Sequence, residues 1–156
     1  MKLSIVIPAY NEEESITETI TTLYAKLHAE SIPHEILVVN DNSKDNTVGV
    51  LEDLKKSITT LRYITNTPPK NGFGYAVRKG LDNFQGDCVA IVMADLSDSP
   101  DDLVKFYRTM VEGNYDCVFG SRFSKGGKVY DYPKIKLYIN RLANTIVRLT
   151  FGFKYN

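Results

Sequence analysis

Short apolar runs alternate with amphipathic segments along most of this chain. The runs are LSIVIP, HEILVVN, LRYITN, DCVAIVMA and YDCVFGS, and helical spacing of apolar residues lies between them near 12–30, 45–55, 74–83 and 100–112. Strands that are apolar at successive positions are typical of a sheet covered on both sides. The pattern therefore predicts an α/β fold with a mostly parallel central sheet and helices on both faces.

The pattern changes after Ser121. The loop RFSKGGKVYDYPK precedes a last helical stretch near 135–150, in which apolar residues recur at helical spacing with basic residues between them. A basic amphipathic helix is suited to contact with an anionic membrane surface, and equally to packing on a core with its other face in water. No repeat or low-complexity linker interrupts the chain, so we expect one domain over residues 1–156.

Composition narrows the class of protein. The chain has 156 residues, 43% hydrophobic and 24% charged, which is the size and composition of one globular domain. Nineteen basic residues balance nineteen acidic ones, so no overall positive field favours a nucleic-acid partner. Cys88 and Cys117 both lie in apolar runs, which predicts buried free thiols and a cytoplasmic location. No run reaches the ~20 apolar residues that a membrane-spanning helix needs.

Polar segments follow each of the first four runs. They are PAYNEEE, NDNSKDN, NTPPKNGFGYA and ADLSDSPDD. In an open parallel sheet, ligands bind beyond the carboxyl ends of the strands, where these segments would meet. Carboxylates suit a hard cation such as Mg²⁺ or Mn²⁺, and glycine amides beside a lysine suit phosphate. The combination predicts a nucleoside diphosphate ligand.

Some of the acidic residues have a simpler structural explanation. Asn11 and Glu14 fit a capping box, and Asp101 and Asp102 belong to a helix start after Ser99.

Other residues keep both a structural and a functional interpretation. Asp95 and Asp98 come before the helix cap, and Asp41 comes one residue after a strand, so all three remain functional candidates. Gly72 and Gly74 do not form a Walker loop, and they suit either a tight turn or a phosphate cradle with Lys70 at its edge.

Five segments together resemble one family. SIVIPAYNEEESI, EILVVNDNS, KNGFGYAVRKGL, MADLSDSP and FGSRFSKGG occur in the order and spacing of the family 2 glycosyltransferases of GT-A fold. They look most like the polyprenyl-phosphate branch of that family, the dolichyl-phosphate mannose synthase type. The resemblance extends from residue 3 to about residue 148.

The resemblance implies roles for individual residues. It implies that Asp95 and Ser97 hold Mg²⁺ or Mn²⁺, that Arg122 and Arg141 lie near the phosphate and the acceptor, and that Asp98 is a further candidate in catalysis. The residues implied in binding the nucleotide sugar are Pro8, Ala9, Tyr10, Glu12, Asp41, Lys70, Gly72, Gly74 and Asp95, and those implied in catalysis are Asp95, Asp98 and Arg122.

The sequence departs from the family pattern in two respects. Met93 stands where the family usually has the first aspartate of its metal motif, and a thioether does not replace a carboxylate for a hard cation. Family members also continue into further acceptor-side and membrane-associated segments, so we expect this chain to be a catalytic domain truncated at its C-terminus.

The expected activity is inverting transfer of a hexose from a GDP- or UDP-linked sugar to an acceptor. A lipid phosphate acceptor, such as polyprenyl phosphate, is already anionic and needs no strong base, and it implies peripheral contact with the cytoplasmic face of a membrane. Two alternatives stay open: transfer to a saccharide hydroxyl, with Asp98 as base, and a degenerate nucleotide-binding module without turnover. PAYNEEE is too acidic for a nucleotidyltransferase loop.

Overall fold

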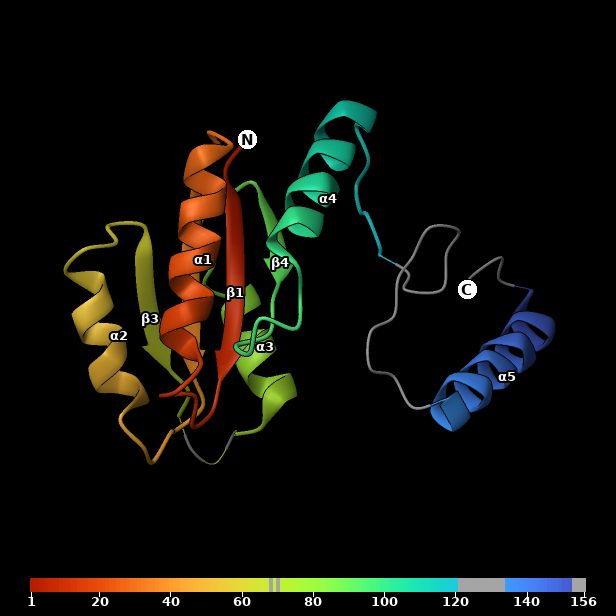
Figure 1. Ribbon diagram of the computed structural model, residues 1–156, viewed down its shortest axis with the longest axis horizontal. Coiled ribbons are helices and arrows are strands. Elements are labelled where there is room, and N and C mark those ends of the chain that lie inside the picture. Colours follow the sequence, from red (N-terminus) through yellow and green to blue (C-terminus); the bar gives the residue numbers. More distant parts are fainter. Residues whose placement is uncertain (68, 70, 121–133, 153–156) are drawn as a thin grey trace. The chain divides into compact units, whose positions relative to one another are not determined.

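The computed structural model describes residues 1–67, 69, 71–120 and 134–152 (Figure 1). The chain divides into two compact units, Met1–Asp116 and Cys117–Asn156. The first contains β1 (Leu3–Ala9), α1 (Ile16–Ala29), β2 (His34–Asn40), α2 (Thr47–Lys55), β3 (Leu61–Thr65), α3 (Phe73–Leu81), β4 (Cys88–Ile91) and α4 (Pro100–Gly113). The second contains α5 (Lys134–Phe151).

The four strands form one parallel sheet in the order β3-β2-β1-β4. Every residue of β1 and β2 is buried, whereas β4 at the sheet edge alternates between half-buried and exposed positions. The predicted α/β fold with a parallel central sheet is confirmed.

Helices cover both faces of the sheet, as the apolar runs predicted. One hydrophobic cluster joins Leu3, Ile5 and Ile7 of β1 to residues of α1, α2 and α4. The other joins residues of the opposite parity, Val6 of β1 with Leu37 and Val39 of β2, to Ala76 of α3. Because successive side chains of a strand point to opposite faces, α3 lies on the face opposite α1, α2 and α4 (Figure 1).

One predicted helix start, one predicted cap and one predicted strand are wrong. The first helix begins at Ile16, not near residue 12, and the proposed capping box does not form, because Asn11 has a φ of 56° and its side chain accepts the Lys44 N–H. The predicted fifth strand does not form over residues 115–120. Cys117 is consequently exposed rather than buried, while Cys88 is half-buried, and both thiols are free.

Helix α5 carries a broad apolar surface. The prediction of a helix near 135–150 is confirmed, and its exposed apolar residues include Tyr138, Leu142 and Leu149. No helix in the described part of the chain is long and apolar enough to cross a membrane.

Helix α3 packs closely on the sheet through Gly80, where an added Cβ would lie 2.2 Å from Val6 Cγ1. At Gly74 of the same helix, nothing lies within 4 Å of an added Cβ. We expect Gly80→Ala to lower the free energy of unfolding by about 1–3 kcal/mol, because buried Val6 cannot move aside without cost. Urea denaturation measures the change. Gly74→Ala is the matched control and should be neutral or slightly stabilising, and equal effects of the two variants would contradict the prediction.

The buried carboxylate of Glu35 links the amino-terminal parts of the strands to neighbouring segments. Glu35 of β2, 3% exposed, accepts hydrogen bonds from Ser4 Oγ (2.5 Å), Arg62 Nε (2.8 Å) and the Gln85 N–H. Burial alone would raise the pKa of Glu35, but these hydrogen bonds outweigh it and hold the pKa below its ordinary value. Its contribution to stability is therefore present above the unfolded-state pKa and is lost as the pH falls through the folded-state pKa.

We expect Glu35→Gln to lower the free energy of unfolding by about 2 kcal/mol at pH 7, because Arg62 loses its charged partner. The difference from the parent chain should begin to shrink as the pH falls below the ordinary glutamate pKa of about 4.3, where the carboxylate of the unfolded chain becomes protonated, and should be lost once the pH passes the lower pKa of the folded chain. Denaturation of both proteins between pH 3 and 7 measures it. A difference that does not change with pH would contradict an ionised Glu35.

Candidate functional site

The loops after β1 and β2 interlock through hydrogen bonds in both directions. The Asn11 N–H donates to Ser43 Oγ (3.0 Å), and the Lys44 N–H donates back to Asn11 Oδ1 (2.7 Å). Further along, the Glu12 N–H donates to Thr47 Oγ1 (2.9 Å). Polar side chains of each loop thus satisfy main-chain groups of the other, which fixes both loops at the carboxyl edge of the sheet.

Several acids of these loops are occupied by this interlocking. The Asn46 N–H donates to the Glu13 carboxylate (2.7 Å), and the Glu13 N–H donates to Asp45 (3.1 Å). Burial alone would raise the pKa of Asp45, but hydrogen bonds from Thr47 and Glu13 lower it. Glu12, implied in binding the nucleotide sugar, is half-buried, and its carboxylate accepts the Ser15 hydroxyl (2.5 Å).

Asp41 connects three segments at the carboxyl edge. Its side chain is buried, with the residue 7% exposed, and its N–H donates to Ala9 O at the end of β1 (2.8 Å). Asn66 Nδ2, one residue past β3, donates to Asp41 Oδ1 (2.8 Å). The Gly72 N–H, at the start of α3, donates to Asp41 Oδ2 (2.5 Å). The ends of β1, β2 and β3 and the start of α3 are therefore joined at one residue, Asp41.

The glycine turn beside Asp41 has an open surface. Gly72 has a φ of 106°, a conformation that favours glycine, and nothing lies within 4 Å of a Cβ added at Gly72 or Gly74. Main-chain atoms are therefore accessible here, as both a tight turn and a phosphate cradle require. Tyr10, directly after β1, is 51% exposed, which leaves its ring available for stacking.

The loop after β4 exposes residues on either side of a buried alanine. Thr19 of α1, fully buried, donates to Ala94 O (2.6 Å), and this bond ties the loop to α1. Met93, 38% exposed, and Asp95 flank Ala94 at the surface. Asp98 Oδ2 accepts the Met93 N–H (3.0 Å), so this carboxylate closes the loop on itself.

Asp95 stays ionised at neutral pH. The side chain and the N–H of Ser97 donate to its carboxylate, the N–H at 3.0 Å, and these hydrogen bonds lower the pKa of Asp95. An exposed carboxylate next to a hydroxyl suits a hard cation that takes its other ligands from a diphosphate. Within the described residues, no group of three or more His, Cys, Asp or Glu residues is placed to enclose a metal. The donor set thus fits a cation shared with the ligand, not one held by protein alone.

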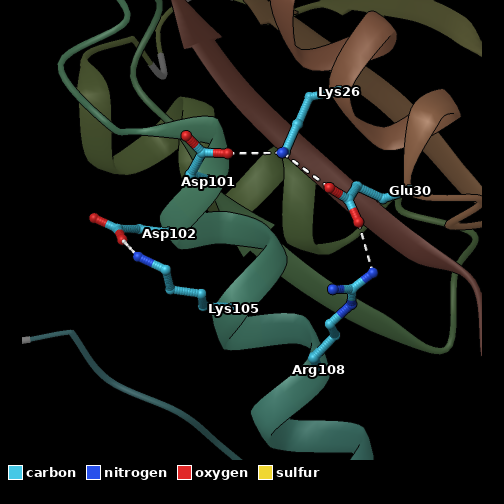
Figure 2. Close-up of polar contacts among 6 residues, drawn as sticks. All are labelled: Lys26, Glu30, Asp101, Asp102, Lys105 and Arg108. Carbon is cyan, nitrogen blue, oxygen red and sulfur yellow. Dashed lines mark hydrogen bonds and ion pairs between the residues drawn. The ribbon is translucent and has the colours of Figure 1, made fainter.

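Asp101 and Asp102 belong to the helix start, as the sequence predicted. Helix α4 begins at Pro100 after the N-cap Ser99. Figure 2 shows Asp101 bound to Lys26 of α1 (2.7 Å), which also binds Glu30 (2.9 Å), and Glu30 in turn binds Arg108 (2.6 Å). These ion pairs fix α4 beside α1, directly after the loop that carries Asp95.

The structure joins some of the implied residues and leaves others apart. Pro8 and Ala9 end β1, and hydrogen bonds link Ala9 and Gly72 to Asp41. Arg141 lies exposed in α5, in the other unit, while Lys70 and Arg122 lie outside the described residues. Sequence reasoning missed Asn66, although it follows its strand directly, as Asp41 does.

The family model of glycosyl transferase family 2 matches residues 4–155. The chain belongs to this family. It is 32% identical over 149 residues to a dolichol-phosphate mannosyltransferase of Pyrococcus furiosus, an alignment that covers 96% of this chain and 41% of that protein. The chain thus spans about two fifths of the length of this relative.

Solved structures share the fold. S. aureus TarS 1-349 in complex with UDP-GlcNAc has a TM-score of 0.60 at 25% identity, covering 80% of this chain and 39% of that one. A mannosyltransferase of Pyrobaculum calidifontis in complex with GDP-Man and Mn²⁺ has a TM-score of 0.58 at 23% identity, covering 69% of this chain and 32% of that one. The parallel sheet with its helices is that of the GT-A glycosyltransferases, as the resemblance implied.

Proposed function

We propose that this chain carries the nucleotide-sugar site of an inverting glycosyltransferase that moves a hexose from a GDP- or UDP-linked sugar to a polyprenyl phosphate. The observation that carries the proposal is the buried residue Asp41, whose carboxylate binds Asn66 after β3 and the open glycine turn at Gly72 and whose N–H binds Ala9 O at the end of β1. Family membership supports it, as do the dolichol-phosphate mannosyltransferase relative and TarS with UDP-GlcNAc.

The nucleoside would lie between Tyr10 and Asp41, and the diphosphate would lie toward the glycine turn and Asp95. Tyr10 offers an exposed ring, and the open main chain at Gly74 offers its N–H to phosphate, while the Gly72 N–H stays bound to Asp41. Lys70 and Arg122 are proposed to add positive charge near the diphosphate. Such groups stabilise the negative charge that develops on the departing diphosphate.

Asp95 and Ser97 are the residues proposed to hold Mg²⁺ or Mn²⁺. When bound, the cation would neutralise charge on the diphosphate. Hydrogen bonds from Ser97 lower the pKa of Asp95 further below neutral pH, and Asp98 supports the same loop through the Met93 N–H.

A lipid phosphate is the acceptor that fits best with the described residues. Its oxygen is already anionic, so the reaction needs no strong base, and α5 combines exposed apolar residues with Arg141 and Arg148. This composition favours peripheral contact with an anionic membrane surface. Transfer to a saccharide hydroxyl is the second candidate. Asp98 would then be the base, but its carboxylate already accepts the Met93 N–H.

A thermal-shift panel of GDP, UDP and their sugar conjugates, with and without Mg²⁺ or Mn²⁺, tests the nucleotide site. A ligand at about 100 times its Kd should stabilise the protein by about 2.7 kcal/mol. The panel identifies the nucleotide base and the cation in the same experiment. Transfer of labelled hexose to polyprenyl phosphate tests the acceptor, with an oligosaccharide as the alternative. No shift with any nucleotide would contradict the proposal, and binding without transfer would favour the degenerate module.

Two variants of the β4 loop test the cation site. Asp95→Ala should abolish the metal-dependent part of the thermal shift while the metal-free part persists, because the proposed cation ligand is lost. Met93→Asp should strengthen the metal-dependent part, because it adds a hard carboxylate beside Asp95. Asp102→Ala, in the same region but bound to Lys105, is the matched control and should leave both parts unchanged. An undiminished metal-dependent shift in Asp95→Ala would exclude Asp95 as a ligand.

A further inference from the structure

Asn66 is a buried polar residue at the carboxyl edge of the sheet to which neither the sequence nor the family resemblance assigns a role. It lies one residue past β3 and is 6% exposed. Its N–H donates to Asn40 O (2.8 Å), which continues the ladder between β2 and β3. Its side-chain oxygen accepts the Thr67 N–H (3.2 Å), and this bond orients the amide so that Nδ2 faces Asp41.

The amide of Asn66 and the main chain of Gly72 bind different oxygens of the Asp41 carboxylate. The distances are 2.8 Å from Asn66 Nδ2 to Oδ1 and 2.5 Å from the Gly72 N to Oδ2. A carboxylate is planar, so a donor that fixes one oxygen also fixes the direction of the other. Hydrogen bonds to a charged acceptor are the stronger kind, and in a buried place they are costly to lose.

Besides its bond to Asp41, Gly72 accepts the N–H groups of Tyr75 (2.9 Å) and Ala76 (3.1 Å) within α3, at its carbonyl oxygen. Its φ of 106° and ψ of 158° lie in a region that glycine alone adopts readily, and a Cβ there would meet nothing within 4 Å. It is also the N-cap residue of α3, and no side chain caps that helix. The bonds at the Gly72 carbonyl lie within α3, so the bond to Asp41 is the one that links the glycine turn to the ends of β2 and β3, and Asn66 holds the other oxygen of that carboxylate.

We propose that Asn66 is a positioning residue that orients the Asp41 carboxylate and thereby holds Gly72 and the start of α3 in place for a nucleoside diphosphate. The inference rests on the proposed function of this site. It adds that the part of the site proposed to bind the nucleoside is coupled to the part proposed to bind the phosphates. Asn66 itself does not contact the ligand in this scheme. Its loss should therefore act on binding only through Asp41 and Gly72.

The test measures binding and the Gly72 amide in the same variants. Kd values for UDP and for GDP are determined by calorimetry, and the Gly72 N–H is followed by NMR without ligand. Asn66→Ala should weaken binding of the preferred nucleotide about tenfold and should move the Gly72 resonance, because its charged acceptor is no longer fixed. Asn66→Asp, which keeps the shape but loses the donor, should do the same.

The matched control is Asn83→Ala. Asn83 Nδ2 also donates a 2.8 Å hydrogen bond, to Lys79 O near the end of α3, and its removal should change neither the Kd nor the Gly72 signal. Unchanged binding in both Asn66 variants would overturn the proposal, as would weaker binding with an unmoved Gly72 resonance. Unfolding of both variants would assign Asn66 to stability alone. If the parent chain binds neither UDP nor GDP, the proposed function fails, while the Gly72 signal still tests the coupling.

Discussion

The burial of β1 between two parallel neighbours is the constraint on which the rest of the structure depends. β1 pairs with β2 along its whole length, Leu3 to Ala9, but with β4 only as far as Val6. Val6 O accepts the Val92 N–H. In a parallel ladder every second residue of a strand bonds to the same neighbour, so the next donor of β1 toward β4 would be Pro8, which has no N–H. Pairing with β4 ends there, at the position where strand order reverses and α/β sheets bind ligands.

The loops beyond these strands are held by one another rather than by helix caps. Side chains after β1 bind main-chain groups after β2, and the reverse, while Thr19 holds the loop after β4 from α1. Asp41 likewise binds the segment after β3 through Asn66 and the start of α3 through Gly72. The loops after β1, β2 and β3 therefore support one another at the carboxyl edge, and the loop after β4 is supported by α1. This arrangement leaves Tyr10, the glycine turn and Asp95 accessible on a fixed support.

The sequence predicted the parts that depend on local periodicity. The four strands, the helices and the polar segments at the carboxyl edge follow from apolar runs and from the rule that ligands bind beyond strand ends.

The sequence did not predict that α1 begins at Ile16, because hydrogen bonds to a loop more than thirty residues away override the capping pattern of Asn11 and Glu14. Asn66 was missed for the same reason, since its partner Asp41 is distant in sequence. The strand predicted at 115–120 has suitable residues, but a strand also needs a paired neighbour.

The loop after β4 carries the residues that we propose as ligands of a divalent cation. Asp98 accepts the Met93 N–H, Asp95 accepts the N–H and side chain of Ser97, and Met93 offers only a thioether. Asp95 is the carboxylate that we propose faces the ligand. A hard divalent cation commonly takes one or two protein carboxylates and completes its shell with phosphate oxygens and water. With a single carboxylate, affinity for the cation depends strongly on the diphosphate, and by linkage affinity for the diphosphate depends equally on the cation. A cation held by this loop would therefore bind together with the nucleotide rather than before it.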